Sequence, residues 1–124
     1  MRLFTLGLAC TALLASHPAR ADQVHFTGET TASAVLIKDT LQTIAQYGYS
    51  LRRCPAPSAV EAKILPTSYV PRNPQYRLGT GTVVREMWNV TLCGEKIRFL
   101  VTFWPDGSGG SMFGIGYPYP DDAP

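Results

Sequence analysis

The sequence predicts an α+β fold: one N-terminal helix packed on an antiparallel β-meander of three or more strands, with one disulfide. Three observations favour this fold class. Residues 30–47 carry an apolar stripe with helical spacing, two segments between residues 82 and 103 alternate apolar and polar side chains, and two cysteines follow an N-terminal leader. The 124 residues, of which 45% are hydrophobic, suffice for one ordinary domain.

The first 21 residues have the three parts of a secretory signal peptide. Arg2 supplies a positive charge, an apolar run covers residues 3–15, and Ala19-Arg20-Ala21 forms a small-x-small cleavage site. The apolar run is too short to cross a bilayer as a helix. We therefore expect cleavage after Ala21 and an exported mature chain, periplasmic or secreted, without a transmembrane span.

Two features of the leader matter for the mature protein. Lipidation of Cys10 would tether the chain, but this alternative is less favoured because Gly7, not an aliphatic residue, stands three positions upstream. The leader also contains Arg2 and Arg20, two of the eleven basic residues, and none of the nine acidic ones. The mature chain therefore has no formal net charge, and we expect no nucleic-acid partner.

A helix is expected from about Thr30 to Tyr47, after a polar entry segment at residues 22–29. Its apolar and small residues recur on one stripe: Ala34, Ile37, Leu41, Ile44, Ala45 and Gly48. Gly48 is the expected stop, and Arg52-Arg53 follow near the negative end of the helix dipole, where we interpret them as a solvated helix end rather than a binding patch. Because the stripe is built from small residues, we expect the helix to pack closely against a sheet.

Cys54 and Cys93 are the two cysteines that remain after cleavage, and in an exported chain they are expected to form a disulfide. Closing a loop of this length would stabilise the fold by about 4 kcal/mol. The alternative, a reactive thiol pair, lacks the Cys-x-x-Cys spacing.

The segment after Cys54 is rich in proline. Pro55 and Pro57 predict a rigid extended turn. Residues 58–65 fit either a short helix capped by Ser58 or a strand. Residues 66–77 contain three prolines and two tyrosines, which predicts a loop, with an edge strand around Tyr69 as an option.

Residues 82–93 and 97–103 alternate as two strands of a hairpin. Gly94 suits the first central position of a two-residue type II′ turn, which pairs Leu92 with Ile97. The apolar faces of the two strands then coincide, as burial of one face requires.

This register has two consequences for side chains near the ends of the hairpin. Arg85 lies opposite Trp104, where a cation–π contact would form. Cys93 points to the face opposite the core, which is the weak point of the predicted disulfide.

The Pro105-Asp106-Gly107 turn leads to a third antiparallel strand at residues 111–115. We therefore expect a single domain at residues 22–115. Residues 116–124, Gly-Tyr-Pro-Tyr-Pro-Asp-Asp-Ala-Pro, are expected to be an extended or disordered tail. The Tyr-Pro-Tyr-Pro stretch is either an extended ligand segment or an ordinary terminus.

Few residues of the mature chain offer catalytic chemistry. His25 is its single histidine, so neither a His-activated nucleophile nor a His-based metal site is expected, and we predict no metal and no cofactor. Glu86, among apolar strand residues, and Asp106, in a glycine-rich turn, form a candidate acid–base pair. The preferred interpretation places Glu86 at the sheet edge or beside an arginine, and Asp106 in an ordinary turn.

The better indication of function is aromatic, because Tyr and Trp are enriched in binding surfaces. Trp104 lies on the face expected to point away from the core and is flanked there by Arg85 and Arg98. These three residues, together with Tyr69 of the nearby loop, are the candidate partner-binding residues. The alternative is that Trp104 and the Tyr69 loop only cover the second face of the sheet.

Two runs of the hairpin form a pattern. Residues 86–94 read Glu-Met-Trp-Asn-Val-Thr-Leu-Cys-Gly, and residues 101–110 read Val-Thr-Phe-Trp-Pro-Asp-Gly-Ser-Gly-Gly. The pattern resembles that of small exported bacterial proteins of uncharacterised function. This resemblance implies a secreted or periplasmic location and assigns no active site.

The leading hypothesis is an exported, non-enzymatic binding or accessory module that binds a protein partner or a component of the bacterial cell envelope. One rival is a small hydrolase that uses Glu86 and Asp106, and another is a structural component of an envelope assembly. A buried Glu86 or a deep pocket would count against the binding module. A large distance between the two carboxylates would count against the hydrolase.

Overall fold

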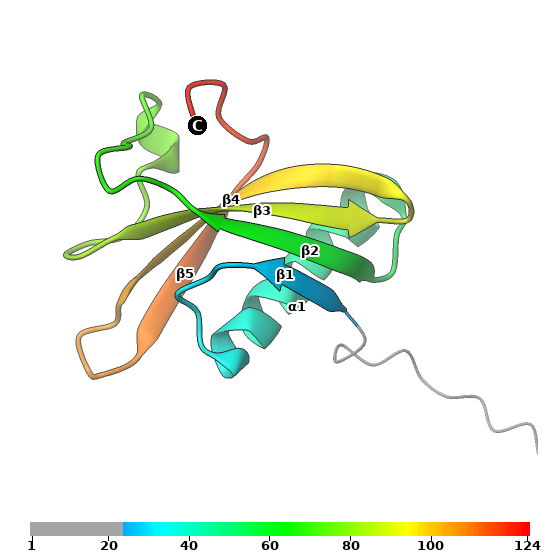
Figure 1. The fold of residues 1–124 in the computed structure, drawn as a ribbon, viewed down its shortest axis with the longest axis horizontal. Helices are drawn as coiled ribbons and strands as arrows, with labels where there is room; N and C mark the ends of the chain where they lie inside the picture. Colours follow the sequence, from blue (N-terminus) through cyan, green and yellow to red (C-terminus); the bar gives the residue numbers. More distant parts are fainter. Residues whose placement is uncertain (1–23) are drawn as a thin grey trace, which may run out of the picture.

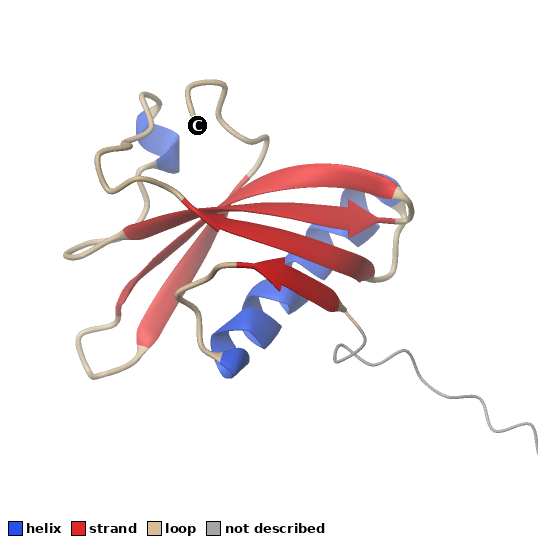
Figure 2. Ribbon diagram, viewed as in Figure 1, coloured by secondary structure: helices blue, strands red, loops and turns tan. Residues whose placement is uncertain are grey.

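The computed structural model describes residues 24–124, so the predicted leader, its cleavage site and Cys10 lie outside the described residues. The elements in chain order are β1 (His25–Gly28), α1 (Ala34–Arg52), β2 (Pro57–Ile64), the 3-10 turn η2 (Pro74–Tyr76), β3 (Val84–Leu92), β4 (Glu95–Pro105) and β5 (Ser111–Gly116). The strands form one sheet in the order β1-β2-β3-β4-β5, and α1 runs across one face of it (Figures 1 and 2). The predicted α+β class is confirmed.

All neighbouring strands of the sheet are antiparallel except β1 and β2, which run parallel. The helix α1 connects these two strands across one face of the sheet. The expected polar entry segment therefore contains a strand, and that expectation is wrong. Phe26 alternates inward and packs edge-on against Trp88, with ring centroids 5.2 Å apart. A strand of four residues is too short for its alternation to be recognised in the sequence.

The helix lies four to five residues further along the chain than expected. Ser33 is its N-cap, with the side-chain oxygen accepting a hydrogen bond from the Leu36 N–H, and Arg53 closes it in the left-handed conformation. The threonines before Ser33 bind Glu86 instead of starting the helix. Gly48 is not the stop but a buried interior residue.

Gly48 shows how closely the helix approaches the sheet. A Cβ at this position would lie 2.9 Å from a methyl carbon of Leu92 in β3. Glycine inside a helix costs about 1 kcal/mol relative to alanine, and here it allows the backbone of α1 to reach the core. The prediction of close packing through small residues is confirmed.

The predicted hairpin is present, but its register is shifted by two residues. Leu92 pairs with Glu95, and Val90 pairs with Ile97. The central turn residues are Cys93 (φ 48°) and Gly94 (φ 82°), so the turn has the two positive φ angles of type I′ rather than the expected type II′. A shift of two leaves every side chain on its predicted face, so the buried face is correct while the individual pairs are wrong.

The shift removes the predicted contact between Arg85 and Trp104. Arg85 lies opposite Thr102, and its Nη1 donates a 3.2 Å hydrogen bond to the carbonyl oxygen of Tyr69. The shift also explains the disulfide. Because Cys93 belongs to the turn and not to the strand, the alternation of faces does not hold its side chain away from its partner.

The disulfide joins Cys54 to Cys93, with Cα atoms 5.8 Å apart, and confirms the predicted pairing. It ties the end of α1 to the tip of the β3–β4 hairpin. Beside it, Arg52 Nη1 lies 3.0 Å from Glu95 Oε2. The covalent bond and the ion pair hold α1 and the hairpin together at one end.

The core lies between α1 and the sheet. It contains the inward side chains of β3 and β4, with Leu41 and Ile44 from the helix and Val60 from β2. Trp88 and Phe99 are the largest fully buried side chains. Among the described residues, no helix is long and apolar enough to cross a membrane.

Candidate functional site

The face of the sheet opposite α1 is covered, over β4 and β5, by a loop and not by a helix. Residues 65–83, the loop between β2 and β3, lie against this face. A Cβ on Gly116 would meet the ring of Tyr76, and a Cβ on Gly79 would meet the indole of Trp104. The Tyr76 side chain of the loop therefore sits on the glycine backbone of β5, and the Trp104 side chain of β4 sits against a glycine of the loop. Leu100, on the same face, is 1% exposed.

The loop is shaped by its own polar contacts. Asn73 caps the turn η2, accepting a 3.0 Å hydrogen bond from the Gln75 N–H, and Pro74 occupies its first position. Arg77 donates from Nε to the Pro71 carbonyl (2.7 Å) and from Nη2 to the Arg72 carbonyl (2.8 Å). A loop without regular structure is thereby fixed in one conformation. The expected edge strand around Tyr69 is not formed.

Residues 117–124, which we call the tail, belong to the segment expected to be extended or disordered; they form no strand and lie against the loop. Figure 1 shows the C-terminus beside the loop that contains η2. The carboxylate of Asp122 accepts a 2.8 Å hydrogen bond from the Arg72 N–H, and its Oδ2 lies 3.5 Å from Arg72 Nε. The Tyr69 hydroxyl donates to Asp122 Oδ1 at 3.4 Å. Asp122 thus fastens the tail to the loop.

A second attachment comes from the sheet. The guanidinium carbon of Arg98 in β4 lies 4.8 Å from the centroid of the Tyr119 ring, a cation–π contact. The Tyr119 hydroxyl donates to the carbonyl oxygen of Pro124 at 3.0 Å. We use the name loop–tail surface for residues Tyr69, Arg72, Tyr76, Arg98, Tyr119, Asp121 and Asp122.

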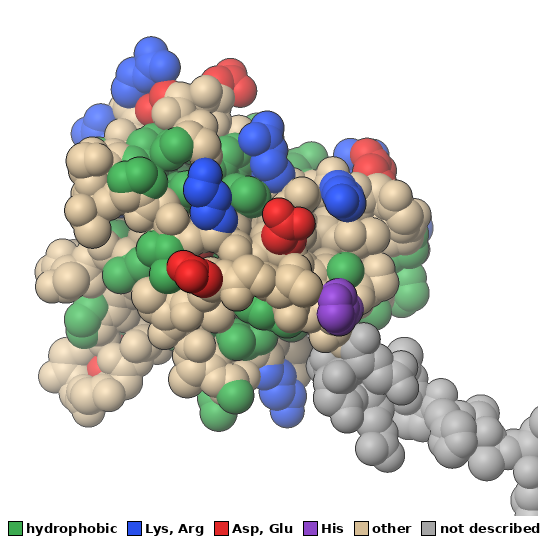
Figure 3. Space-filling view, viewed as in Figure 1, with side chains coloured by type: hydrophobic (Ala, Val, Ile, Leu, Met, Phe, Trp, Pro, Cys, Tyr) green, Lys and Arg blue, Asp and Glu red, His purple; other side chains and the backbone are tan. Residues whose placement is uncertain are grey.

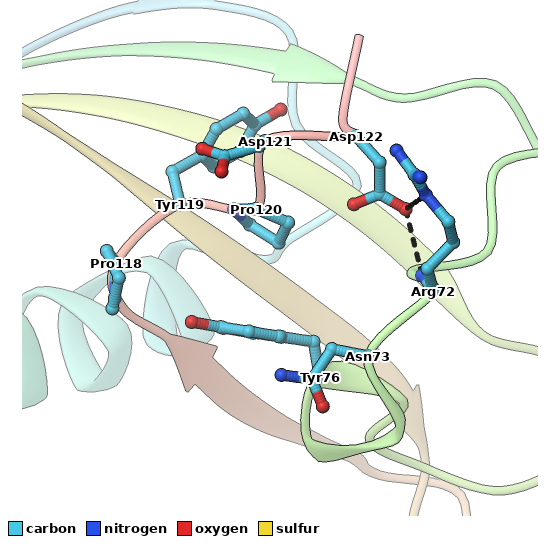
Figure 4. Close-up of a pocket in the computed structure, with 8 residues that line it drawn as sticks. All are labelled: Arg72, Asn73, Tyr76, Pro118, Tyr119, Pro120, Asp121 and Asp122. Atoms are coloured by element: carbon cyan, nitrogen blue, oxygen red, sulfur yellow. Dashed lines mark hydrogen bonds and ion pairs between the residues drawn. The ribbon is translucent and has the colours of Figure 1, made fainter.

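A groove of about 420 Å³ separates the loop from the tail (Figure 4). Its walls come from the two segments and consist of Arg72, Asn73 and Tyr76 on one side and residues 118–122 on the other. Figure 4 shows the Tyr76 ring extending across the floor toward Pro118, while Arg72 and Asp122 meet at the far end. The lining combines tyrosine and proline rings with the charged groups of Arg72, Asp121 and Asp122.

The contacts shift the pKa values of three groups. Burial raises the pKa of the Tyr69 phenol to about 12, with the Asp122 charge and hydrogen bond acting in the same direction. The hydrogen bond from the Arg72 N–H lowers the pKa of Asp122 below its usual value of 3.8. Burial raises the pKa of Tyr119, which Arg98 partly offsets. At neutral pH, Asp122 is ionised and both phenols are neutral, the state in which all of these contacts form.

The four candidate partner-binding residues are placed as follows. Arg85 and Tyr69 touch each other through the Tyr69 carbonyl, and Arg98 joins the same surface through Tyr119. Trp104 is half-buried beneath Gly79, away from the groove. The structure therefore brings Arg85, Tyr69 and Arg98 to one surface.

Sequence reasoning missed Arg72, Tyr76, Tyr119 and Asp122 as site residues. One signal was present: residues 66–77 and residues 117–124 are both rich in proline and tyrosine. The first segment contains two arginines and no carboxylate, and the second contains two aspartates and no basic residue. Matching composition with opposite charge indicates that two segments can pair, although it does not give the geometry.

Figure 3 shows the result on the molecular surface. Basic, acidic and hydrophobic side chains are intermingled over the upper part of this view, where Figure 1 places the loop and the C-terminus. The exposed guanidinium of Arg72 is the most accessible of the charges in the two ion pairs, with 85% of its side chain exposed. Apolar rings beside accessible charges are typical of protein-binding surfaces.

Glu86 does not lie at the sheet edge or beside an arginine, so that expectation is wrong. It is fully buried on β3, the middle strand. Its Oε1 accepts from the N–H and hydroxyl of Thr31 (2.7 and 2.8 Å), and its Oε2 accepts from the Thr30 hydroxyl and Trp88 Nε1 (both 2.8 Å). Four donors satisfy the two carboxylate oxygens in place of an arginine.

The burial of Glu86 counts against a binding module by the criterion given above, because a buried carboxylate can be catalytic. Here each oxygen already accepts two hydrogen bonds from the fold. The carboxylate joins the segment before α1 to the middle of the sheet, which gives its burial a structural explanation.

Glu86 and Asp106 are also too far apart to work together. Glu86 pairs with Val101, and Asp106 follows Val101 by five positions along the chain, so the two are separated by roughly 16 Å. Paired carboxylates in glycoside hydrolases lie about 5 to 10 Å apart. Asp106 is exposed and accepts hydrogen bonds from Ser108 and Gly110, which lower its pKa, as in an ordinary turn.

His25 is exposed on β1. Within residues 24–124, no three His, Cys, Asp or Glu side chains are grouped closely enough to hold a metal ion. Comparison with family models, curated proteins and solved structures gives no match for this chain.

Proposed function

We propose that this chain is an exported, non-enzymatic binding module that binds a protein partner through the loop–tail surface. The observation that carries the proposal is the groove between Tyr76 and the tail, with aromatic and proline rings in its walls and Arg72 at its rim. Tyrosine and arginine are the residues that most often dominate binding energy at protein interfaces.

The scaffold beneath this surface supports the same function. The five-stranded sheet, the helix and the Cys54–Cys93 disulfide form a platform beneath the loop, so the loop wall of the groove is in place before a partner arrives. A preformed site loses less conformational entropy on binding than a flexible one. The disulfide and the signal-peptide pattern together support an oxidising compartment, periplasmic or secreted, as the place of action.

The test of binding compares three versions of the full chain. An immobilised Arg72→Ala/Tyr76→Ala variant alters the loop wall of the groove, and Tyr49→Ala alters an exposed tyrosine on α1 as a matched control. A protein from the envelope or medium of the source cells should be retained by wild type and by Tyr49→Ala, and lost with the double variant. The purified protein should then bind with an affinity reduced at least about tenfold by the double variant. Equal retention on all three would contradict the proposal.

The test of export is the intact mass of the natural protein, with and without reduction. Export predicts a chain that starts at Asp22, lacks two hydrogens and resists thiol alkylation until it is reduced. A chain that still carries residues 1–21 and alkylates freely would contradict this part of the proposal.

A further inference from the structure

The tail provides a model for the chemistry that its own surface accepts. It presents an aromatic ring to Arg98 and a carboxylate to Arg72 and Tyr69, and Pro120 between them is buried. Asp122 is 50 or more positions away in the sequence from the residues that it contacts, Arg72 and Tyr69. The contacts of the tail resemble those by which a separate extended peptide would be held.

The loop and the tail carry opposite charges, and Arg72 and Asp122 pair across them. Residues 65–83 contain Arg72 and Arg77 and no Asp or Glu, and the sheet adds Arg85 and Arg98 on the same face. The carboxylates of the surface, Asp121 and Asp122, both come from the tail. Without residues 117–124, Arg72 would lose its carboxylate partner and Arg98 its aromatic partner, and the loop contains no acidic residue that could replace Asp122.

The tail is also held in a way that allows exchange. It belongs to no strand, and Arg72, which pairs with Asp122, is largely exposed. Residues 119–124 belong to no element of the sheet, so their contacts can open without displacing a strand. Contacts of this kind open at a lower free energy than the global unfolding of the protein.

We propose that the partner of this surface supplies an extended, acidic segment containing tyrosine and proline, which replaces the tail on Arg98, Arg72 and Tyr69. This inference rests on the proposed function and names its ligand class. The tail is then a built-in competitor, and the groove between Tyr76 and Pro118 is the place where the incoming segment first makes contact. Prolines keep such a segment extended before binding, which lowers the entropy lost on docking.

The test uses the full chain and a labelled synthetic peptide with the sequence of residues 117–124. A Tyr119→Ala/Asp122→Asn variant, here called the released variant, removes the two anchors of the tail. In wild type, the attached tail competes at an effective concentration on the order of millimolar. Competition at this concentration predicts that a peptide whose Kd for the open surface is about 0.1 mM or lower binds the released variant at least about tenfold more tightly than wild type.

Two matched controls identify the chemistry. A peptide with both aspartates changed to asparagine should bind the released variant about fivefold more weakly, because the charge-assisted contact with Arg72 is lost. Adding Arg98→Ala to the released variant should weaken binding of the original peptide. Circular dichroism and thermal unfolding establish that each variant is folded.

Three results would overturn the inference: a folded released variant that binds the peptide no better than wild type, equal binding of the asparagine peptide, or no binding at all. Concentration-dependent dimers of wild type that disappear in the released variant would also overturn it, since a second copy would then be the occupant. The peptide assay needs no natural partner. It can therefore fail while the retention experiment succeeds, or the reverse, so the two proposals are judged separately.

Discussion

The two faces of the sheet are covered in different ways. On one face α1 buries Leu41 and Ile44 against the core and is tied to the β3–β4 hairpin by the Cys54–Cys93 disulfide. On the other face the loop and the tail lie over β4 and β5, joined to each other by the Asp122 carboxylate. The first cover is apolar and covalently fastened, and the second combines packed rings, such as Tyr76 over Gly116, with polar contacts that are partly exposed.

The difference separates stability from binding. Apolar burial and loop closure account for most of the free energy that holds a small domain together, and both are concentrated on the helix side. Exposed ion pairs and cation–π contacts contribute about 1 kcal/mol or less each, so the cover on the second face can open while the domain remains folded. A surface that opens without unfolding is suited to exchange one segment for another.

The largest effect is expected on the helix side. Replacing both cysteines (Cys54→Ala/Cys93→Ala) removes a closed loop with 39 positions between its ends and should lower the free energy of unfolding by about 4 kcal/mol. Guanidinium denaturation of the variant and of wild type measures this loss. A loss below about 1 kcal/mol would mean that the disulfide is not a main source of stability on the helix side of the sheet.

A smaller loss is expected for Glu86→Gln. The N–H groups of Thr31 and Trp88 bind different carboxylate oxygens, so in either orientation of the glutamine one of them faces an NH₂ group. One unsatisfied buried donor should cost about 2 kcal/mol of unfolding free energy. The exposed Glu61→Gln on β2 is the matched control and should stay within about 0.5 kcal/mol of wild type. Equal free energies of unfolding for the two variants would contradict the proposal that the Glu86 carboxylate stabilises the fold through its hydrogen bonds.

On the loop–tail side, Arg98→Ala should change the free energy of unfolding by no more than about 1 kcal/mol, because it removes one exposed cation–π contact. Chemical denaturation followed by circular dichroism measures this change. Arg53→Ala, which removes a similar contact with Tyr49 at the end of α1, serves as the control. If Arg98→Ala were as damaging as loss of the disulfide, the two faces would not differ in the way described.

The smallest effect is a titration. The neutral phenol of Tyr69 is favoured in the fold, so its contribution is complete below the ordinary pKa of 10.0 and is lost as the pH rises toward about 12. Asp122→Asn removes a negative charge that raises this pKa, so Tyr69 should ionise at lower pH in that variant. Ultraviolet titration of the phenolate, with Tyr69→Phe to assign the signal, measures the shift. An unchanged titration would show that Asp122 does not contact Tyr69 in solution.

The helix side was largely predictable from sequence because its signals are local. The apolar stripe predicted α1, alternation predicted the faces of β3 and β4, and cysteine counting predicted the disulfide. The errors lie where local signals compete: Gly48 resembles a helix stop but serves close packing, and Gly94 takes the second central position of the turn instead of the first.

The loop–tail side was predictable in composition but not in arrangement. Tyr69, Arg85 and Arg98 were selected from residue type, and the structure brings them to one surface. The contact between Arg72 and Asp122 joins segments 50 positions apart and depends on the path of a loop without regular structure. The path of an irregular loop leaves no periodic pattern in the sequence. Asp122 could therefore not be assigned as the partner of Arg72 and Tyr69, nor Tyr119 as the partner of Arg98.

Native-state hydrogen exchange tests the difference between the two faces most directly. The amide of Arg72, which binds Asp122, and the amide of Ala123 in the tail report on the loop–tail cover, and the amides of β3 report on the core. The account predicts that the Arg72 and Ala123 amides exchange at least about 100-fold faster than those of β3 under conditions where the domain is folded. Equal protection of the two sets would show that the loop–tail cover opens only when the whole domain unfolds, and would contradict the exchange of the tail for a partner segment.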